Sequence, residues 1–410
     1  MSAGDIKNVP VGILVVGGGV SGTAAALASA RSGVPTALME RETFLGGAGY
    51  AGLLRHICGL YLNGGPFPEE TLNPGIVREV VGHLHDLSPH LVVKKMGLVY
   101  VLPYSREDLR NVFNSLCNSE PLLSVYDATT AIAVEKSGPH IGKVLAGHAG
   151  TIYNIIPEIV IDCSGSGAVA AMAGASFELA PYEQVQLAGY TIRLTGIKGN
   201  DESLAIKVPY YLNEAVRKNM LPPAVMFTTY SPGDTPDEGY CKMSLDSAEG
   251  DERERDAEKN STLVHHYLAD TLPEFRDSAI VETSLRVMER EGKRISGEYI
   301  LTENDVLSAS KFDDGIVRNS WPIELWDKNK GTVYKYVKAG DYYEIPFRCI
   351  KVRDIPNLLC AGRCISVSHE ALGSTRVMGT CMALGEQAGL AAAFIVKQGR
   401  YPERADRKYK

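Results

Sequence analysis

The stretch VGILVVGGGVSG, residues 11–22, decides the fold of this chain. Its first half, residues 11–16, is continuously apolar, which is typical of a parallel strand covered on both faces. A helix of small residues is expected over 21–32, because it follows the glycines and Gly33 can end it. A second strand is expected over 35–40. A strand, a helix and a strand within about thirty residues predict the βαβ unit of a doubly wound sheet.

The glycine turn matches the pattern G-x-G-x-x-G, and each glycine in it has a physical role. Gly17 permits the tight turn, Gly19 lets backbone N–H groups approach a pyrophosphate, and Gly22 lets the helix pack on the strand. The start of the helix favours the anion. Glu40 ends the second strand and would accept hydrogen bonds from ribose hydroxyls. A glycine turn that binds nothing is the alternative, but this full context favours a dinucleotide site.

Further strands are expected to join the same parallel sheet. Short β-rich runs over 122–160 predict a third strand followed by a small meander. A buried strand over 159–162 runs into the glycine turn CSGSG and an Ala-rich helix. A last strand over 355–362 ends in another glycine turn, and a helix over 378–396 closes the chain. The fold class is therefore α/β, with a Rossmann-type domain that contains βαβ units and a small β-meander.

The remaining sequence indicates a second domain. Residues 181–344 hold Tyr and Pro clusters and lack the βαβ rhythm, so we expect an α+β substrate or cap domain there. The nucleotide-binding domain then consists of residues 1–180 and 345–410. Within it, an amphipathic helix is expected over 103–119, entered at Ser105 with an acidic residue three positions on.

Three features favour FAD over NAD as the dinucleotide. Arg41 and a second glycine pair, Gly46-Gly47, follow Glu40 closely. Another glycine turn follows Asp162 on the same sheet. The chain also returns to the sheet with a strand, a glycine turn and a helix after a long excursion. A nicotinamide dehydrogenase rarely needs that return, whereas an extended FAD does.

The composition is that of an ordinary globular protein. The chain has 410 residues, of which 45% are hydrophobic and 22% are charged, enough for two domains. The net charge of −7 argues against a nucleic-acid partner, which needs clustered Lys and Arg. A small-molecule substrate is expected, and an oligomer is possible.

The cysteines and apolar runs limit the alternatives further. The eight cysteines form no C-x-x-C pair, so neither a disulfide framework nor a zinc site is expected, and no metal is predicted. The group Cys360, Cys364 and Cys381 fits no ferredoxin spacing; Cys360 and Cys364 could form a redox pair, but structural thiols are favoured. The early apolar run lacks the features of a signal peptide, and the run over 378–396 reads as a buried helix and not a membrane span. A cytoplasmic location is expected.

Several segments, spread along nearly the whole chain, resemble the sequence pattern of a known protein family. These segments are VVGGGVSGTAAALASARSGVPTALMERETFLGG, IDCSGSGAVAAMAGA, GKRISGEYILTENDVL with FDDGI, and YEIPFRCI followed by NLLCAGRCISVSHEALGSTRVMGTCMALGEQAGLAAA. The chain resembles the FAD-dependent oxidoreductase family within the glutathione-reductase-like superfamily, and the last segment is the most specific. It departs from better-known relatives because Arg363 stands where an acidic residue is usual. It also lacks a second G-x-G-x-x-G and the C-x-x-x-x-C redox pair.

The resemblance implies a set of FAD-binding residues. They are Gly17, Gly19, Ser21 and Gly22 at the pyrophosphate, Glu40 at the ribose with Arg41 and Gly47 beside it, Cys163, Ser164 and Gly165 at the adenosine half, Gly362 and Arg363 by the ribityl chain, and Arg376, Met378 and Gly379 near the flavin pyrimidine. The start of the last helix has a physical purpose there, because its dipole stabilises the negative charge of a reduced flavin.

Four residues are candidates for catalysis. His369, on the loop entering the last helix, is the first choice for acid–base work; the alternative is a histidine that caps backbone groups. His56 or Cys58 could tether the flavin, shuttle a proton or supply a reactive thiol, although a buried cysteine often only fills space. Arg376 could clamp a carboxylate substrate, and Arg294 is a weaker candidate for the same task.

The leading functional hypothesis is a two-electron oxidoreductase acting on a small polar metabolite. Oxygen, a quinone or a partner protein could be the other redox partner. One alternative is a monooxygenase-like enzyme that NAD(P)H visits transiently. Others are a binding module that reuses the scaffold without redox chemistry, and an enzyme similar to thiazole synthases, in which a cysteine gives up its sulfur.

Overall fold

The computed structural model describes residues 6–246 and 251–403, and its largest sheet has seven strands. The order is β6-β2-β1-β9-β8-β7, with β20 also paired to β9. The parallel strands are β1 (Ile6–Val16), β2 (Thr36–Met39), β6 (Leu123–Tyr126), β9 (Thr151–Asp162) and β20 (Leu358–Cys360).

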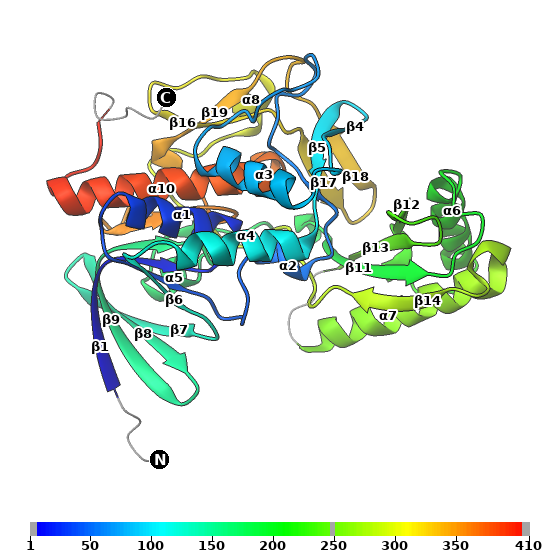
Figure 1. Ribbon diagram of the computed structural model, residues 1–410, viewed down its shortest axis with the longest axis horizontal. Helices are drawn as coiled ribbons and strands as arrows, with labels where there is room; N and C mark the ends of the chain where they lie inside the picture. The colour runs from blue at the N-terminus through cyan, green and yellow to red at the C-terminus, as the bar shows by residue number, and fades with distance from the viewer. Residues whose placement is uncertain (1–5, 247–250, 404–410) are drawn as a thin grey trace.

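Strand β9 changes its partner on one side while it pairs with β1 on the other. Its first residues pair antiparallel with β8 (His140–His148), and residues 160–162 pair parallel with β20. β7 (Thr130–Ser137) completes the meander that Figure 1 shows at the end of the sheet near the N-terminus. The expected third strand and meander are confirmed. β1 is longer than the apolar run suggested, because residues 6–11 pair with the first half of β9.

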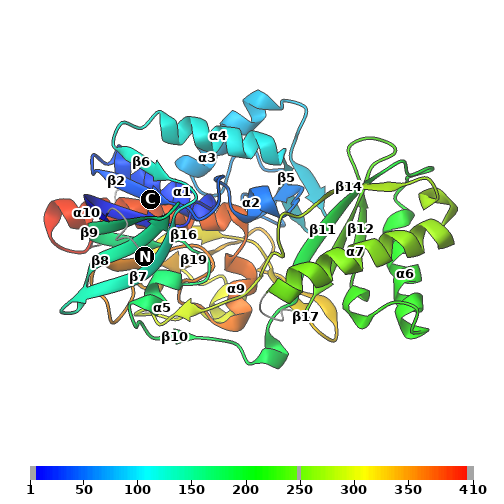
Figure 2. The same ribbon diagram turned by 90° about the horizontal axis from the view of Figure 1, so that it is seen from below.

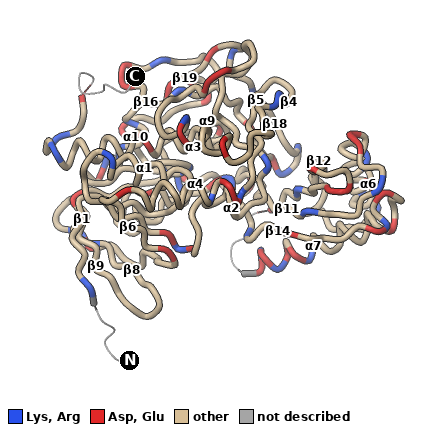
Figure 3. Tube along the Cα trace, viewed as in Figure 1, with Lys and Arg blue, Asp and Glu red and all other residues tan. Residues whose placement is uncertain are grey.

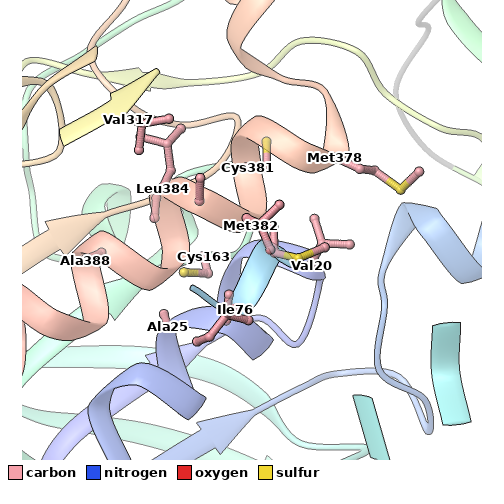
Figure 4. Packing of buried hydrophobic residues seen from close by; sticks show 14 of the residues in the cluster. Val20, Ala25, Ile76, Cys163, Val317, Met378, Cys381, Met382, Leu384 and Ala388 are labelled. Carbon is pink, nitrogen blue, oxygen red and sulfur yellow. The ribbon is translucent and has the colours of Figure 1, made fainter. Parts of the chain in front are cut away.

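Helices α1 (Val20–Arg31) and α10 (Met378–Gln398) pack closely against each other (Figure 4). A Cβ on Gly385 would lie 1.9 Å from the carbonyl oxygen of Ser21, and one on Gly389 would lie 2.3 Å from that of Ala25. In the described part of the chain, α10 is the one helix long and apolar enough to cross a membrane, and 67% of its apolar window is buried. Its glycine contacts and burial are those of the expected core helix.

A second, antiparallel sheet lies to one side of the molecule (Figures 1 and 2), and we call it the cap sheet. Its order is β12-β13-β11-β14, and its residues share a hydrophobic cluster with two helices. Figure 3 shows acidic and basic residues interspersed along these helices, as expected of solvated faces. The elements are β11 (Ala188–Thr195), α6 (Leu204–Arg217), β12 (Thr229–Pro232), β13 (Gly239–Leu245), α7 (Asp251–Thr271) and β14 (Ala279–Thr283).

The segment after the cap sheet returns to the first core. Leu301, Val317 and Tyr343 belong to the same cluster of buried residues as β1 and α10. The division at 181–344 therefore stays a prediction, and this packing favours a cap that ends nearer Val287, the last buried residue of the cap cluster. The elements of this segment are β15 (Arg294–Ile295), α8 (Glu303–Leu307), β16 (Gly315–Asn319), β17 (Ile323–Asp327), β18 (Gly331–Lys335) and β19 (Tyr343–Pro346).

Shorter elements connect these layers. The expected helix over 103–119 is α4, whose N-cap Ser105 accepts a hydrogen bond of 3.4 Å from the N–H of Asp108. This confirms the entry that the sequence predicted. The remaining elements are α2 (Ala48–Ala51), β3 (His56–Ile57), α3 (Ile76–Leu87), β4 (Lys94–Met96), β5 (Val99–Pro103), α4 (Arg106–Asn118), α5 (Ala168–Met172), β10 (Phe177–Glu178) and α9 (His369–Thr375).

Candidate active site

Three glycines at the junction of β1 and α1 are needed for different reasons. Gly17 has a φ of 105°, which other residues adopt only with strain. A Cβ on Gly22 would lie 1.7 Å from the carbonyl oxygen of Gly17, so the helix could not approach the strand. Gly19 has an ordinary φ of −69°, and the nearest atom to a Cβ there would be the Cα of Gly47 at 3.9 Å. The protein itself has room for a side chain at Gly19, so glycine there keeps the helix start open.

Helix α1 begins at this opening without a side-chain cap. The N–H groups of a first helical turn lack partners inside the helix, and the helix dipole gives that end a partial positive charge. An open, uncapped helix start beside a small-residue turn suits a pyrophosphate. The residues present therefore fit the dinucleotide that the sequence predicted, with Ser21 and Gly22 in the first turn.

The carboxylate of Glu40 holds the turn together. Its Oε2 accepts a hydrogen bond of 2.6 Å from the N–H of Gly18, and its Oε1 accepts one of 2.9 Å from the N–H of Glu42. Glu40 is only 7% exposed. A carboxylate has about four acceptor positions, so capacity remains for ribose hydroxyls. Sequence reasoning assigned Glu40 to the ribose and missed this structural role.

Two further predicted residues follow Glu40 in the chain. A Cβ on Gly47, whose φ is 52°, would lie 2.9 Å from the Cα of Gly19, so the second glycine pair abuts the first turn. The N–H of Gly46 donates to the carbonyl of Gly18 at 2.8 Å. The side chain of Arg41 is 62% exposed and lies beside a neighbouring carboxylate. The sequence-predicted residue Gly47 therefore abuts the start of α1, whereas Arg41 is an exposed side chain paired with Glu42.

The turn after β9 lies at the same edge of the sheet. A Cβ on Gly17 would lie 2.5 Å from the carbonyl oxygen of Cys163, so the two turns touch. Buried Asp162 organises the second turn, because its carboxylate accepts from the N–H and hydroxyl of Ser164 at 3.0 and 2.6 Å and from the N–H of Ala170 at 3.0 Å. Gly165 has a φ of 75°. The three residues predicted at the adenosine half are thus adjacent to the glycine turn.

The turn after β20 and the start of α10 complete this edge. A Cβ on Gly362, whose φ is 93°, would lie 3.3 Å from the Cβ of Ser21. Arg363 donates to the carbonyl of Glu289, in the segment after the cap sheet. Helix α10 starts at Met378 without a side-chain cap.

One predicted contact at α10 needs correction. The N–H of Gly379 donates to the carbonyl of Cys58 at 2.9 Å, so it is already engaged. A Cβ on Gly379 would lie 2.7 Å from the carbonyl oxygen of Gly59, and close packing therefore explains this glycine. The prediction of donors near the flavin pyrimidine then rests on the other N–H groups of the first turn.

His369 is held by a carboxylate that the sequence did not single out. Its Nδ1 lies 2.9 Å from Oε1 of Glu291, whose side chain is only 2% exposed. The same oxygen lies 2.5 Å from Nη1 of Arg294, and Nε of Arg294 donates to the carbonyl of Val367 at 3.0 Å. The guanidinium of Arg294 is thus already paired, which disfavours its predicted role as an anion clamp. Glu291 fixes the ring of His369 through one nitrogen.

His56 and Cys58 have strongly shifted pKa values. Burial, with a smaller contribution from Arg55, lowers the pKa of His56 to about 4, so its ring is neutral at pH 7. Burial raises the pKa of Cys58 to about 12, so the thiol keeps its proton. A protonated thiol is a poor nucleophile, which disfavours both a reactive thiol and a sulfur donor at Cys58.

The other cysteines of interest are buried. Cys163, Cys360, Cys364 and Cys381 all lie in the core, and burial raises the pKa of Cys163, Cys360 and Cys381. Within residues 6–246 and 251–403, no three or more His, Cys, Asp or Glu side chains are placed to hold a metal ion.

A polar cluster that sequence reasoning missed lies between α9 and the cap sheet. Both tryptophans of the chain donate their indole N–H groups to Glu324: Trp326 to Oε1 at 3.0 Å and Trp321 to Oε2 at 3.3 Å. The ring of Trp326 lies 4.3 Å from Nζ of Lys242 and 3.9 Å from Cζ of Arg290. Lys242 belongs to β13 of the cap sheet, and Arg290 follows β14.

Arg376 joins this cluster from the end of α9. Its Nη2 donates to the carbonyl of Glu324 at 2.9 Å and to Oε1 of Gln186 at 3.4 Å. Nε of Arg376 and Nε2 of Gln186 are buried and have no hydrogen-bond partner within the described residues. The N–H of Gln186 donates to Glu291 at 3.4 Å, so the cluster connects to His369. His369 and Arg376 therefore lie in one hydrogen-bonded network, and the charges of Lys242 and Arg376 act on the pKa of Cys58 against the larger effect of burial.

The charges in the cluster are unbalanced. Arg290, Arg376 and Lys242 are cationic, and Glu324 is the carboxylate among them. Burial, with repulsion between the cations, lowers the pKa of Arg290 to about 9 and that of Lys242 to about 8, and it lowers that of Arg376. Burial would raise the pKa of Glu324, but the three cations outweigh it and the pKa is lowered.

The chain matches the FAD dependent oxidoreductase family model over residues 12–408. A geranylgeranyl bacteriochlorophyll reductase-like protein from Thermoplasma acidophilum has a similar structure, with a TM-score of 0.51 and 11% identity, over 98% of this chain and 82% of that one. No curated protein matches.

Two hydroxylating enzymes share the fold at similar levels. The p-nitrophenol 4-monooxygenase from Pseudomonas putida DLL-E4 has a TM-score of 0.53 and 10% identity, over 98% of this chain and 84% of that one. The anhydrotetracycline hydroxylase from Streptomyces rimosus has a TM-score of 0.55 and 11% identity, over 98% of this chain and 65% of that one. At such identities the likeness shows the fold alone. The match over residues 12–408 shows that the chain belongs to the FAD dependent oxidoreductase family, with FAD as its cofactor.

Proposed function

We propose that this protein catalyses the two-electron oxidation or reduction of a small polar metabolite. The observation that carries the proposal is the open, uncapped start of α1 behind Gly19, at the sheet edge where the turns after β1, β9 and β20 meet. FAD bound along this edge supplies the two-electron chemistry. The polar cluster between α9 and the cap sheet supplies groups that bind and orient a metabolite.

His369 is the residue that we assign to proton transfer. Glu291 holds Nδ1 of its ring, which leaves Nε2 as the nitrogen that exchanges a proton with the substrate. The side chain is 18% exposed, so it is reachable yet fixed in orientation. Glu291 therefore acts as a positioning residue. In an enzyme turning over its substrate, His369→Gln would lower kcat, and Glu291→Gln would change the pH profile more than KM.

The cofactor site is tested by placing a methyl group in the opening. Gly19→Ala has room within the protein, so it should fold normally but lose at least about tenfold in FAD affinity, because its Cβ occupies the approach to the helix start. Gly82→Ala is the matched control, since a Cβ on Gly82 meets nothing within 4 Å and lies away from the turn, on α3. Titration of the apoprotein with FAD, followed by flavin fluorescence, measures both.

The result that contradicts the cofactor assignment is a Gly19→Ala protein that binds FAD as the wild type does. The absorption spectrum of the purified protein before and after acid precipitation is a second measurement. A yellow supernatant indicates dissociable FAD, a yellow pellet indicates a covalent tether, and a colourless protein would contradict the assignment.

A second candidate function is a monooxygenase-like reaction in which NAD(P)H binds transiently. Two of the structural neighbours are hydroxylating enzymes by name, which motivates this candidate. Anaerobic addition of NADH or NADPH distinguishes the two. Rapid bleaching of the flavin band favours the monooxygenase-like reaction, whereas bleaching only by the metabolite favours direct exchange with oxygen, a quinone or a partner protein as the other redox partner.

A further inference from the structure

Taking the proposed function as its basis, we propose that the substrate is a carboxylate, bound by Arg290, Arg376 and Lys242. We call these three residues the cation cluster. They come from three distant parts of the chain: β13, the segment after β14, and the end of α9. Both the cap sheet and the cofactor-side helices therefore contribute to one site.

The cations of this cluster form no ion pair with any described residue. Arg290 is only 6% exposed, and Lys242 and Arg376 are partly buried. Within the described residues, none of the three has a carboxylate oxygen within 4.0 Å of a side-chain nitrogen. The carboxylate of Glu324 is instead taken up by the two indole N–H groups. Buried cations are normally paired, so this arrangement suits an anionic ligand.

Neighbouring aromatic rings and backbone carbonyls hold the three cations in place. Trp326 stacks with Arg290 and lies under Lys242, and Arg290 also donates to the carbonyl of Leu187. Arg376 is anchored by the carbonyl of Glu324. These contacts use ring faces and neutral carbonyls, so the single carboxylate of Glu324 is left to balance three positive charges. The cluster is therefore held in position before a ligand arrives, which lowers the entropy lost on binding.

The cluster also contains hydrogen-bond donors that the protein itself does not use. Nε of Arg376 and Nε2 of Gln186 are buried without a partner in the part of the chain that the structure describes. Both are donors only, and a carboxylate accepts about four hydrogen bonds without donating any. A neutral alcohol or amide would satisfy the donors but not the charge. The pyrophosphate of FAD has its own site at the start of α1, so the cluster is left for the substrate.

The test uses the holoprotein and pairs of probes that differ only in charge. Acetate, succinate and benzoate are each titrated against the corresponding amide at constant ionic strength. Both tryptophans lie in the cluster, so tryptophan emission reports on this site alone, and calorimetry gives an independent affinity. We expect at least one acid to bind about tenfold or more tightly than its amide. Equal binding of acids and amides, or no binding of any acid, overturns the proposal, as does selective binding of phenyl phosphate.

Variants of the cluster residues test whether the acid binds at the cation cluster. Arg290→Met and Lys242→Met should each weaken the acid by about tenfold, and Lys242→Arg should retain its affinity. Lys136→Met, on the exposed part of β7, is the matched control for loss of one positive charge and should bind as the wild type does. Unchanged affinity in both cluster variants overturns the proposal.

The affinity for the acid is expected to decrease as the pH rises. The pKa of Lys242 is lowered to about 8 by burial, so its charge is present below that pH and lost above it. Affinity for the acid should fall as pH rises through about 8 in the wild type, whereas in Lys242→Arg the fall should begin only near pH 9, where Arg290 loses its charge. Chemical reduction of the bound flavin in the same samples distinguishes a wrong substrate class from a wrong proposed function. If the flavin is bound and reducible but no acid binds, the substrate class is wrong, whereas loss of flavin would contradict the proposed function.

Discussion

The glycine turn after β1 and the cation cluster bind anions by different physical means. Residues 17–22 are contiguous, and they offer backbone N–H groups at a helix start. The cation cluster offers side-chain charges that are separated by more than a hundred residues, from Lys242 to Arg376. A backbone site needs only small residues in the right order, whereas a side-chain site needs the whole fold to bring its members together. The first is rigid by its geometry, and the second by stacking on Trp326.

A second contrast is between two neighbouring buried arginines, Arg290 and Arg294. Arg294 and Arg290 are four positions apart and both nearly buried, at 3% and 6% exposed. Arg294 is paired with Glu291, which also holds His369, and it therefore stabilises the structure. Arg290 has no such carboxylate and stacks on Trp326. A buried cation without a carboxylate partner is expected where a ligand, and not the fold, requires the charge.

The largest effect is expected at the glycine turn. Gly22→Ala would place a Cβ 1.7 Å from the carbonyl oxygen of Gly17, so either the helix or the strand must move. We expect a loss of at least about 4 kcal/mol in the free energy of unfolding, or no folded protein. Gly82→Ala, in open space on α3, should instead gain about 1 kcal/mol from helix propensity. Urea unfolding measures both, and similar values for the two variants would contradict the packing argument.

The two arginines provide the next prediction. Arg294→Met leaves the buried carboxylate of Glu291 without its arginine partner and should cost about 3 kcal/mol. Arg290→Met removes a cation that has no ion pair and should change stability by less than about 1 kcal/mol in the absence of a carboxylate ligand. Thermal or urea unfolding of the ligand-free holoproteins tests the order. A larger loss for Arg290→Met would show that its charge serves the fold.

Glu386 on α10 gives a pH-dependent effect on the cofactor side. Its Oε2 accepts from the N–H of Ile76 at 3.0 Å, and burial raises its pKa from 4.5 to about 7. The folded protein holds this proton more tightly than the unfolded chain, so stability is lost as pH rises from about 4.5 to about 7. Glu386→Gln keeps the acceptor without the charge. It should be more stable than the wild type by about 1–2 kcal/mol above pH 7, with no advantage near pH 4, as measured by unfolding at each pH.

The smallest effect is expected at the N-cap of α4. Ser105→Ala removes the hydrogen bond to the N–H of Asp108 and should cost about 1 kcal/mol. Ser115→Ala, at an exposed position of the same helix, should change stability by less than about 0.5 kcal/mol. If both variants unfold at the same urea concentration, the cap contributes nothing.

Much of the cofactor side could be predicted because its signals are local. The apolar run, the glycines and Glu40 are read from one short stretch, and Ser105 marks a helix start by its neighbours alone. The exceptions have long-range causes. The first half of β1 is a strand because it pairs with β9, more than a hundred residues away. Gly379 packs on Gly59, which no spacing in the sequence indicates.

The candidate active site likewise combines features set by local sequence with features set by tertiary structure. The sequence by itself determined the βαβ unit, the FAD-type cofactor site and the candidacy of His369 and Arg376, because each depends on residues close together along the chain. Only the tertiary structure decided that Arg376 meets Arg290 and Lys242 around Trp326, and that Glu291 pairs with Arg294. An isolated lysine or arginine carries no sign of its partners. The role of such a residue depends on its burial and on which charges the folded chain places nearby.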